Sequence, residues 1–258
     1  MPAIYTFHRF GADALRMLPG SLKQPIQRFR RLYNGGVQGA DLFFYYRPMM
    51  PGSVGSVYSS LDPMTGEVFF TQAARILKAS PSDGGIACLY GLLAHYCLRS
   101  QLAPVLRQAM TDADVCRVEL EVELERYLLC LDDRQPAHRQ DLRPCLKMTR
   151  GESVTLTGFF PGVTPRQGWR ALRNTLRWLR RMSAKNRGFA RFLLKFTKGD
   201  FRHQMMPDHA NHKCLHLDKP MLECYDRALE MYPEMAQRLS LFLKNGTPLG
   251  EDFQNTFA

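Results

Sequence analysis

A single histidine inside an apolar helical stretch is the first candidate for chemistry in this sequence. His95 lies in LLAHYCLRSQLAP, residues 92–104. On a helix, the residues four and eight positions further on share its face, and an acid or a second histidine there would complete a set of metal ligands. This chain has Arg99 and Ala103 at those positions. Three interpretations remain open: a lost metal site, a rebuilt site, or a buried core histidine.

A second group of potential ligands is concentrated in FRHQMMPDHANHKCLHLD, residues 201–218. A metal site there requires a helix, on which three imidazoles would share one face beside a carboxylate or a thiol: His209, His212 and His216 with Asp208 or Cys214. Pro207 and the absence of a zinc-finger spacing favour an irregular loop instead. Both interpretations of the histidine-rich residues 203–216 stay open.

The basic residues gather in one segment, residues 165–202, which holds twelve Lys or Arg and one acid, Asp200. Its charge of +11 therefore equals the net charge of the whole chain. At helical spacing, Trp169, Leu172, Leu176 and Leu179 fall on one face, and arginines flank them: Arg166, Arg170, Arg173, Arg177, Arg180 and Arg181. Such a helix either lies on an anionic membrane surface or packs on the core with its arginines in solvent.

The composition limits the kinds of partner. An excess of 35 Lys and Arg over 24 Asp and Glu attracts phosphates on a nucleic acid, a membrane or a small ester. No nucleic-acid-binding motif accompanies the basic segment, so we expect no specific nucleic acid. The seven cysteines are odd in number and form no CxxC pair, and no secretory signal is present, so we expect a cytoplasmic protein, peripheral to the membrane if the arginines bind lipid.

The spacing of apolar residues predicts an all-α fold, because strand-like alternation is scarce. We expect one compact multi-helix domain over residues 1–258. The predicted helices cover residues 11–18, 21–33, 66–79, 84–102, 103–110, 112–131, 165–183, 187–197 and 220–243, and loops are expected at 47–56, 132–144 and 159–165. The longest apolar stretch, residues 86–98, is shorter than the roughly 18 residues that cross a bilayer, so it predicts a buried central helix.

Several stretches together resemble a bacterial family, the zinc-dependent phospholipases C, which share an all-helical fold with P1 nuclease. They are MPAIYTFHRFG (1–11), LYNGGVQGADLFFYY (32–46), the helix with His95, VELEVELERYLL (118–129) and FQNTF (253–257). The resemblance implies a zinc cluster, held by His, Asp and Glu from several helices, that activates water against a phosphodiester.

The departures from that family pattern matter more than the matches. Asp41, His95 and Glu121 remain where the resemblance implies metal ligands. The other ligand positions are substituted, by Phe7, Arg99, Ala103, Arg117 and a residue near Ser59. A guanidinium repels a divalent ion inside a cleft. Buried carboxylates also need a positive charge once the metal is gone. We therefore expect Arg99 and Arg117 to occupy the metal volume and to pair with Asp41 or Glu121.

Two classes of function follow. The first is a pseudoenzyme without a cofactor, which binds a phosphate-bearing ligand such as a phospholipid headgroup, or binds a protein partner. The alternative is an active metal-dependent phosphodiesterase that hydrolyses a phospholipid or another phosphodiester. In that case zinc is held by Asp41, His95 and Glu121, or by ligands from the histidine-rich segment.

Overall fold

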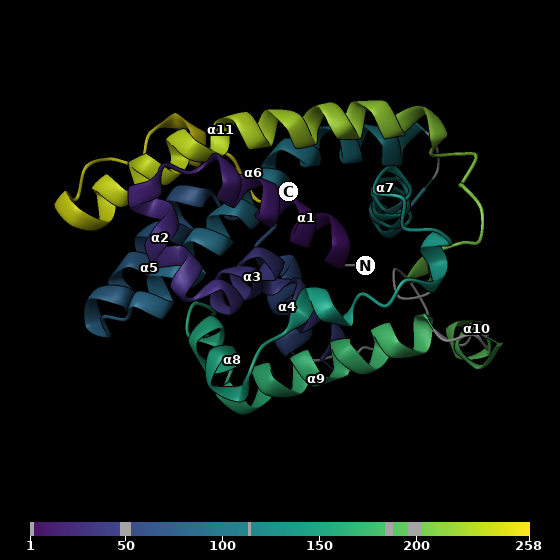
Figure 1. The fold of residues 1–258 in the computed structure, drawn as a ribbon, viewed down its shortest axis with the longest axis horizontal. Helices are drawn as coiled ribbons and strands as arrows, with labels where there is room; N and C mark the ends of the chain where they lie inside the picture. The colour runs from purple at the N-terminus through teal and green to yellow at the C-terminus, as the bar shows by residue number, and fades with distance from the viewer. Residues whose placement is uncertain (1–2, 47–52, 113–114, 184–187, 196–202) are drawn as a thin grey trace.

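The computed structural model describes residues 3–46, 53–112, 115–183, 188–195 and 203–258 (Figure 1). The helices are α1 (Ile4–Met17), α2 (Gly20–Arg28), α3 (Arg30–Gln38), α4 (Ser53–Ser60), α5 (Gly66–Ala79), α6 (Asp83–Asp112), α7 (Arg117–Leu131), α8 (Arg150–Thr157), α9 (Pro165–Met182), α10 (Gly188–Lys195) and α11 (Asp218–Asn245). A 3-10 helix, η1 (Gly39–Tyr45), follows α3, and four shorter ones are η2 (Ala137–Arg139), η3 (Arg143–Leu146), η5 (Leu215–Leu217) and η6 (Glu251–Phe253). In these ranges the only extended pairing is one bridge between Thr65 and Thr256, so the all-α prediction is confirmed.

Helix α6 is the centre of the fold, as its apolar sequence predicts. Nearly every residue from Ala87 to Arg99 is buried, and α3 and α11 make the most extensive contacts with it. The prediction of two helices, 84–102 and 103–110, is wrong, because α6 continues through Pro104. Pro104 is exposed. Water can therefore reach the carbonyl that its missing N–H leaves unbonded, and packing on both sides holds the helix together.

Two glycines bring α3 and α6 into backbone contact. A Cβ atom on Gly36 would lie 2.1 Å from the carbonyl oxygen of Cys88, and one on Gly91 would lie 2.1 Å from that of Tyr33. Only glycine allows such an approach. The close contact places Val37 and the following η1 segment directly against the face of α6 that carries His95.

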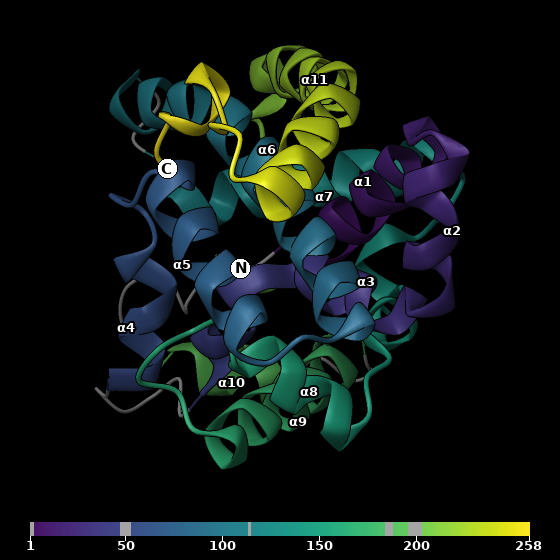
Figure 2. The same ribbon diagram turned by 90° about the vertical axis from the view of Figure 1, so that its left-hand side faces the viewer.

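Helices α8 and α9 form a layer on the side of the molecule opposite α11 (Figures 1 and 2). Helix α9 begins with a capping box in which the Gln167 amide nitrogen donates to Thr164 Oγ1 and the Thr164 amide nitrogen donates to Gln167 Oε1. Pro165 fits the first helical position. The apolar face of α9 packs on η1 and α8, so the basic helix lies beside the segment that carries Asp41.

Several boundaries differ from the sequence-based prediction. The expected helix 21–33 is two helices, because the backbone turns at Phe29 (φ −114°, ψ 38°). Helix α1 begins at Ile4 rather than residue 11, and α8 occupies a segment with no predicted element. Part of the expected loop 47–56 belongs to α4, and the rest, 47–52, lies outside the described residues. The same holds for residues 184–187 and 196–202 of the basic segment.

The described helices are either too short or too polar to cross a lipid bilayer. All seven cysteines lie in the described residues, none of them forms a disulfide, and five are buried. Their burial is consistent with cysteine acting as a small apolar residue in the core.

Candidate functional site

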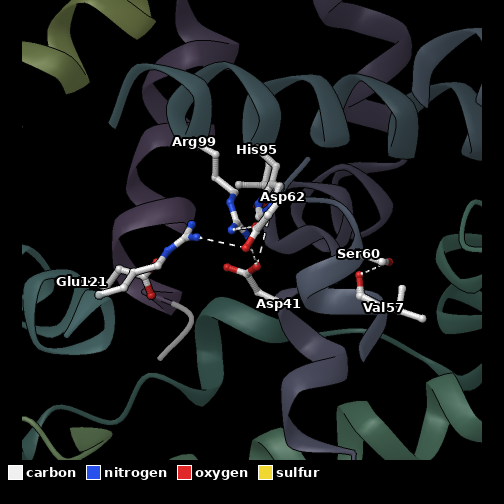
Figure 3. A network of polar contacts seen from close by, with 9 residues as sticks. Asp41, Val57, Ser60, Asp62, His95, Arg99 and Glu121 are labelled. Carbon is white, nitrogen blue, oxygen red and sulfur yellow. Dashed lines mark hydrogen bonds and ion pairs between the residues drawn. The ribbon is translucent and has the colours of Figure 1, made fainter. Parts of the chain in front are cut away.

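The candidate site is built around a buried ion pair between η1 and α6. Asp41 is 2% exposed and Arg99 is 3% exposed. The Arg99 guanidinium donates through Nη1 to Asp41 Oδ1 at 2.7 Å, as Figure 3 shows. Each partner of this buried pair needs the other, because either charge alone would be costly to bury.

A third acid, Asp62, links the two arginines. Arg99 Nη2 donates to Asp62 Oδ1 at 2.8 Å, and Arg117 Nη1 donates to Asp62 Oδ2 at 3.4 Å. Arg117 Nε also donates to Glu121 Oε1 at 2.9 Å, one helical turn along α7. The result is an alternating chain of charges, Asp41–Arg99–Asp62–Arg117–Glu121. The pairing that the sequence predicts for both arginines is present.

Asp62 was not predicted as a site residue. It lies between α4 and α5 in a turn whose sequence has no helical or metal-ligand pattern. Its partners, Arg99 and Arg117, are 37 and 55 residues away in the chain. Only the fold brings them to the same place.

His95 packs against the ion pair as a neutral imidazole. Its ring is fully buried, and Nδ1 lies 3.0 Å from the carbonyl oxygen of Val37, which fixes the tautomer with the proton on Nδ1. Burial and the charge of Arg99 lower the pKa of His95 far below its usual value. Nε2 lies 3.8 Å from Asp41 Oδ1 and has no hydrogen-bond partner among the described residues. Phe7 covers the ring, with centroids 4.5 Å apart.

Gly39 gives the imidazole its space. It has φ of +57°, and a Cβ atom there would lie 2.7 Å from His95 Cδ2. Glycine at this position therefore serves both the left-handed backbone and the close approach of the ring.

The pKa values of Asp41 and Glu121 are shifted in opposite directions. Burial raises the pKa of Asp41 to about 6, although Arg99 opposes that shift. Burial also disfavours the charge of Glu121, but Arg117 and Arg99 outweigh it and hold the pKa of Glu121 below its usual value. Arg99 and Arg117 pair with Asp41, Asp62 and Glu121, so positive and negative groups lie side by side along the network.

The cavity next to these residues is small. It has a volume of about 20 Å³ and is lined by Thr6, Phe7, Arg99, Arg117 and Glu121 together with apolar side chains. That volume holds about one water molecule. A phosphodiester does not fit in the cavity that these residues enclose.

The five predicted residues do not fit the zinc cluster that the family resemblance implies. Asp41 and His95 are close enough to share an ion, but the Arg99 guanidinium is bonded to the same carboxylate oxygen that would ligate it. Two guanidinium groups beside this position repel a divalent cation. The polar groups are instead paired with one another, which is the arrangement expected of a structural network.

The arginine face of α9, which we define as Arg166, Arg170, Arg173, Arg177, Arg180 and Arg181, is exposed along its length. Within the described chain none of these arginines forms an ion pair with an acid. Arg170 lies over the ring of Tyr46, and Arg181 lies over that of Trp178. The opposite face is turned inward: Leu172 and Leu179 are buried, and Trp169 and Leu176 are half-buried against the core. The predicted division of the helix into two faces is present, with the apolar face on the protein.

The histidine-rich segment forms turns and the short 3-10 helix η5 rather than an α-helix. His209, His212 and His216 therefore do not share a helical face, and within the described ranges they do not form a group of metal ligands. Pro207 and the turn at residues 212–214 explain the difference. The group that the structure does bring together is Cys116, Glu119 and His203. The sequence spacing gives no signal for it, because His203 is far from α7 in the chain.

The chain was compared with protein-family models, curated proteins and solved structures. No protein-family model, curated protein or solved structure matches the chain. A function for this protein therefore has to be supported by its fold and its side-chain geometry.

Proposed function

We propose that this protein is a non-catalytic relative of the zinc-dependent phospholipases C, and that it binds the phosphate-bearing headgroups of an anionic membrane with the arginine face of α9. The observation that carries the proposal is six exposed arginines on one helix with no acidic partner in the described chain. Unpaired guanidinium groups in a row are suited to phosphate, which they bind with two parallel hydrogen bonds.

The buried network supports the non-catalytic part of the proposal. The zinc cluster that the resemblance implies would hydrolyse a phosphodiester through a metal-bound water. Here Arg99 and Arg117 are bonded to the carboxylates that would hold the metal, and the adjoining cavity has room for about one water. The same bonds engage both arginines with protein acids, which is why we place phosphate binding on α9 rather than in this cavity.

The expected mode of binding is electrostatic and peripheral. The Trp and Leu side chains of α9 pack on the core and are not available for insertion into lipid. Each basic residue near an anionic surface contributes about 1 kcal/mol. Six such residues give reversible binding that weakens as salt is added.

The test compares vesicles of neutral phosphatidylcholine with vesicles that also contain phosphatidylserine, at low salt. The proposal expects the protein to sediment with the anionic vesicles only, and the double substitution Arg173→Glu, Arg177→Glu to weaken binding by about 30-fold or more, because it replaces two attractive charges with repulsive ones. The control is Arg28→Glu, Arg107→Glu, which makes the same change of net charge at exposed positions of α2 and α6.

Equal weakening by both double substitutions would show that net charge, and not the α9 face, governs binding. Failure of the unsubstituted protein to bind anionic vesicles would refute the membrane proposal. The non-catalytic part is tested separately by measuring phosphodiester hydrolysis with and without added zinc. Zinc-dependent turnover that is abolished by His95→Ala would contradict it.

A further inference from the structure

We propose that Cys116, Glu119 and His203 form a binding site for a divalent transition metal ion, with zinc as the best match. This site goes beyond the proposed membrane function and does not depend on it. Cys116 Sγ, a carboxylate oxygen of Glu119 and a ring nitrogen of His203 all lie within 4.8 Å of one another. The group is distinct from the Asp41 network.

The start of α7 positions two of the three ligands. Cys116 is the N-cap residue and Glu119 follows three positions later, so both side chains lie over the first turn. The Cys116 amide nitrogen donates to Glu119 Oε2 at 2.9 Å. That bond orients the carboxylate and leaves Oε1 directed at His203, whose Nδ1 lies 3.2 Å away.

The chemistry of the three groups suits zinc. A thiolate, an imidazole and a carboxylate are its usual protein ligands, with bonds of about 2.0–2.3 Å. Ligand atoms around one tetrahedral ion are therefore about 3.3–3.8 Å apart, so a group within 4.8 Å needs only small side-chain rotations to close on the metal. When zinc binds, the thiol of Cys116 gives up its proton to the solvent and the sulfur forms the metal bond.

A second observation points to a ligand at this place. Glu119 and His203 form part of the wall of a cavity of about 410 Å³. His209 and His212 line the same cavity. Three protein ligands leave one zinc position for a fourth ligand, which a water or one of these imidazoles would supply.

The neighbouring arginine does not oppose the ion. Arg117 is next to Cys116 in the chain but lies on another side of α7, where it is bonded to Glu121 and Asp62. Cys116 and Glu119 lie close to one helical face, and Arg117 and Glu121 lie on a different one. The charge of Arg117 is therefore paired with acids of the Asp41 network and is directed away from the Cys116 site.

The test uses the full chain, stripped of metal with a chelator and titrated with Zn²⁺ alone in a calorimeter. We expect one equivalent to bind, and Cys116→Ser, Glu119→Gln and His203→Ala each to weaken the affinity at least tenfold. Serine is a good N-cap residue and glutamine keeps the acceptor for the Cys116 amide, so the first two variants preserve the start of α7. Thermal unfolding of each metal-free variant checks that it folds.

Matched controls change the same residue types outside the group. Cys130→Ser alters a half-exposed thiol on the same helix, and His216→Ala alters an exposed imidazole of the same segment. Both should bind Zn²⁺ like the unsubstituted chain. Titration with Co²⁺ should also produce sulfur-to-metal absorption that Cys116→Ser removes. Absence of stoichiometric Zn²⁺ binding, or binding that Cys116→Ser and His203→Ala leave unchanged, would overturn the proposal.

Discussion

At the scale of single residues, the defining feature is a chain of charges in which every acid has an arginine beside it and the Asp41–Arg99 pair is buried. Arg99 is bonded to Asp41 and to Asp62, and it cannot be replaced by an apolar side chain without leaving Asp41 unpaired at 2% exposure. Removing one partner of a buried pair is more costly than removing both.

This asymmetry predicts the effect of Arg99→Met. We expect it to lower the free energy of unfolding by about 3–5 kcal/mol, because it leaves the Asp41 carboxylate buried without a positive charge. Adding Asp41→Asn to that variant should restore a substantial part of the loss, since the neutral amide needs no counter-charge. Urea unfolding of the two single variants and the double variant measures this coupling. A loss below about 1 kcal/mol for Arg99→Met would contradict a buried pair.

A second buried acid gives a pH prediction. Glu125 is fully buried and accepts a hydrogen bond from the Tyr5 amide nitrogen at 2.5 Å; burial raises the pKa of Glu125 to about 8. The folded protein then holds a proton that the unfolded chain releases above its ordinary pKa of 4.5. Stability therefore falls as pH rises from about 4.5 to about 8, by at most about 1.4 kcal/mol per pH unit from this group.

The measurement is the difference between the unsubstituted protein and Glu125→Gln, which stays neutral at every pH. Unfolding free energies should show the variant gaining stability relative to the unsubstituted chain across that window, with no further gain above about pH 8. Because Asp41 and Asp218 titrate in both proteins, the difference isolates Glu125. Parallel curves for the two proteins would rule out a raised pKa at this residue.

At the scale of elements, the site depends on how closely α3 approaches α6. Val37 near the end of α3 accepts from His95, and η1 then delivers Asp41 to Arg99 on the next turn of α6. Both contacts need the two helix backbones to touch, which Gly36 and Gly91 permit. The position of the charge chain is therefore fixed by helix packing as much as by the charges themselves.

Gly91→Ala is the matching prediction. The new methyl group would lie 2.1 Å from the Tyr33 carbonyl oxygen, so α3 must move away and the loss of stability should be about 3 kcal/mol or more. Gly151→Ala, at an exposed position of α8, is the control. No atom is closer than 4.0 Å there, and the change should stabilise by roughly 0.5–1 kcal/mol through helix propensity. Thermal or urea unfolding that ranks the two substitutions in the reverse order would exclude a packing role for Gly91.

At the scale of the whole molecule, six exposed arginines lie together on one helix, α9. Helix α9 lies in the layer opposite α11 (Figure 2). Its arginines are exposed, and its apolar residues pack on the core. Both tryptophans of the chain, Trp169 and Trp178, belong to this helix and pack inward. They therefore report directly on whether α9 stays on the protein when it meets a membrane.

A rigid electrostatic contact predicts that tryptophan emission stays constant on binding. We expect anionic vesicles to retain the protein at low salt while the emission maximum does not shift, and added salt of about 0.15 M to release most of it, because the screening length falls to about 8 Å. Quenching by brominated lipids should be absent as well. A blue shift or strong quenching would show that α9 detaches and inserts its apolar face.

The sequence by itself determined those features that depend on local periodicity and residue type. Regular apolar spacing predicted α5 and α9 within a residue, and the long apolar stretch predicted a buried α6. The family resemblance placed Arg99 and Arg117 beside Asp41 and Glu121, and that placement predicted ion pairs, because a buried carboxylate needs a positive partner wherever it lies. The inward apolar face and outward arginines of α9 follow from a period of 3.6 residues.

The tertiary structure alone decided what depends on contacts between distant segments. Asp62 as the bridge between the arginines and His203 as a neighbour of Cys116 and Glu119 have no sequence signal, since each joins its partners across tens of residues. Packing also decided that α6 continues through Pro104. The proline removes one backbone hydrogen bond, and the contacts with α3 and α11 outweigh that loss. Local spacing specifies which face of a helix is buried, and only the assembled fold specifies which residue it meets there.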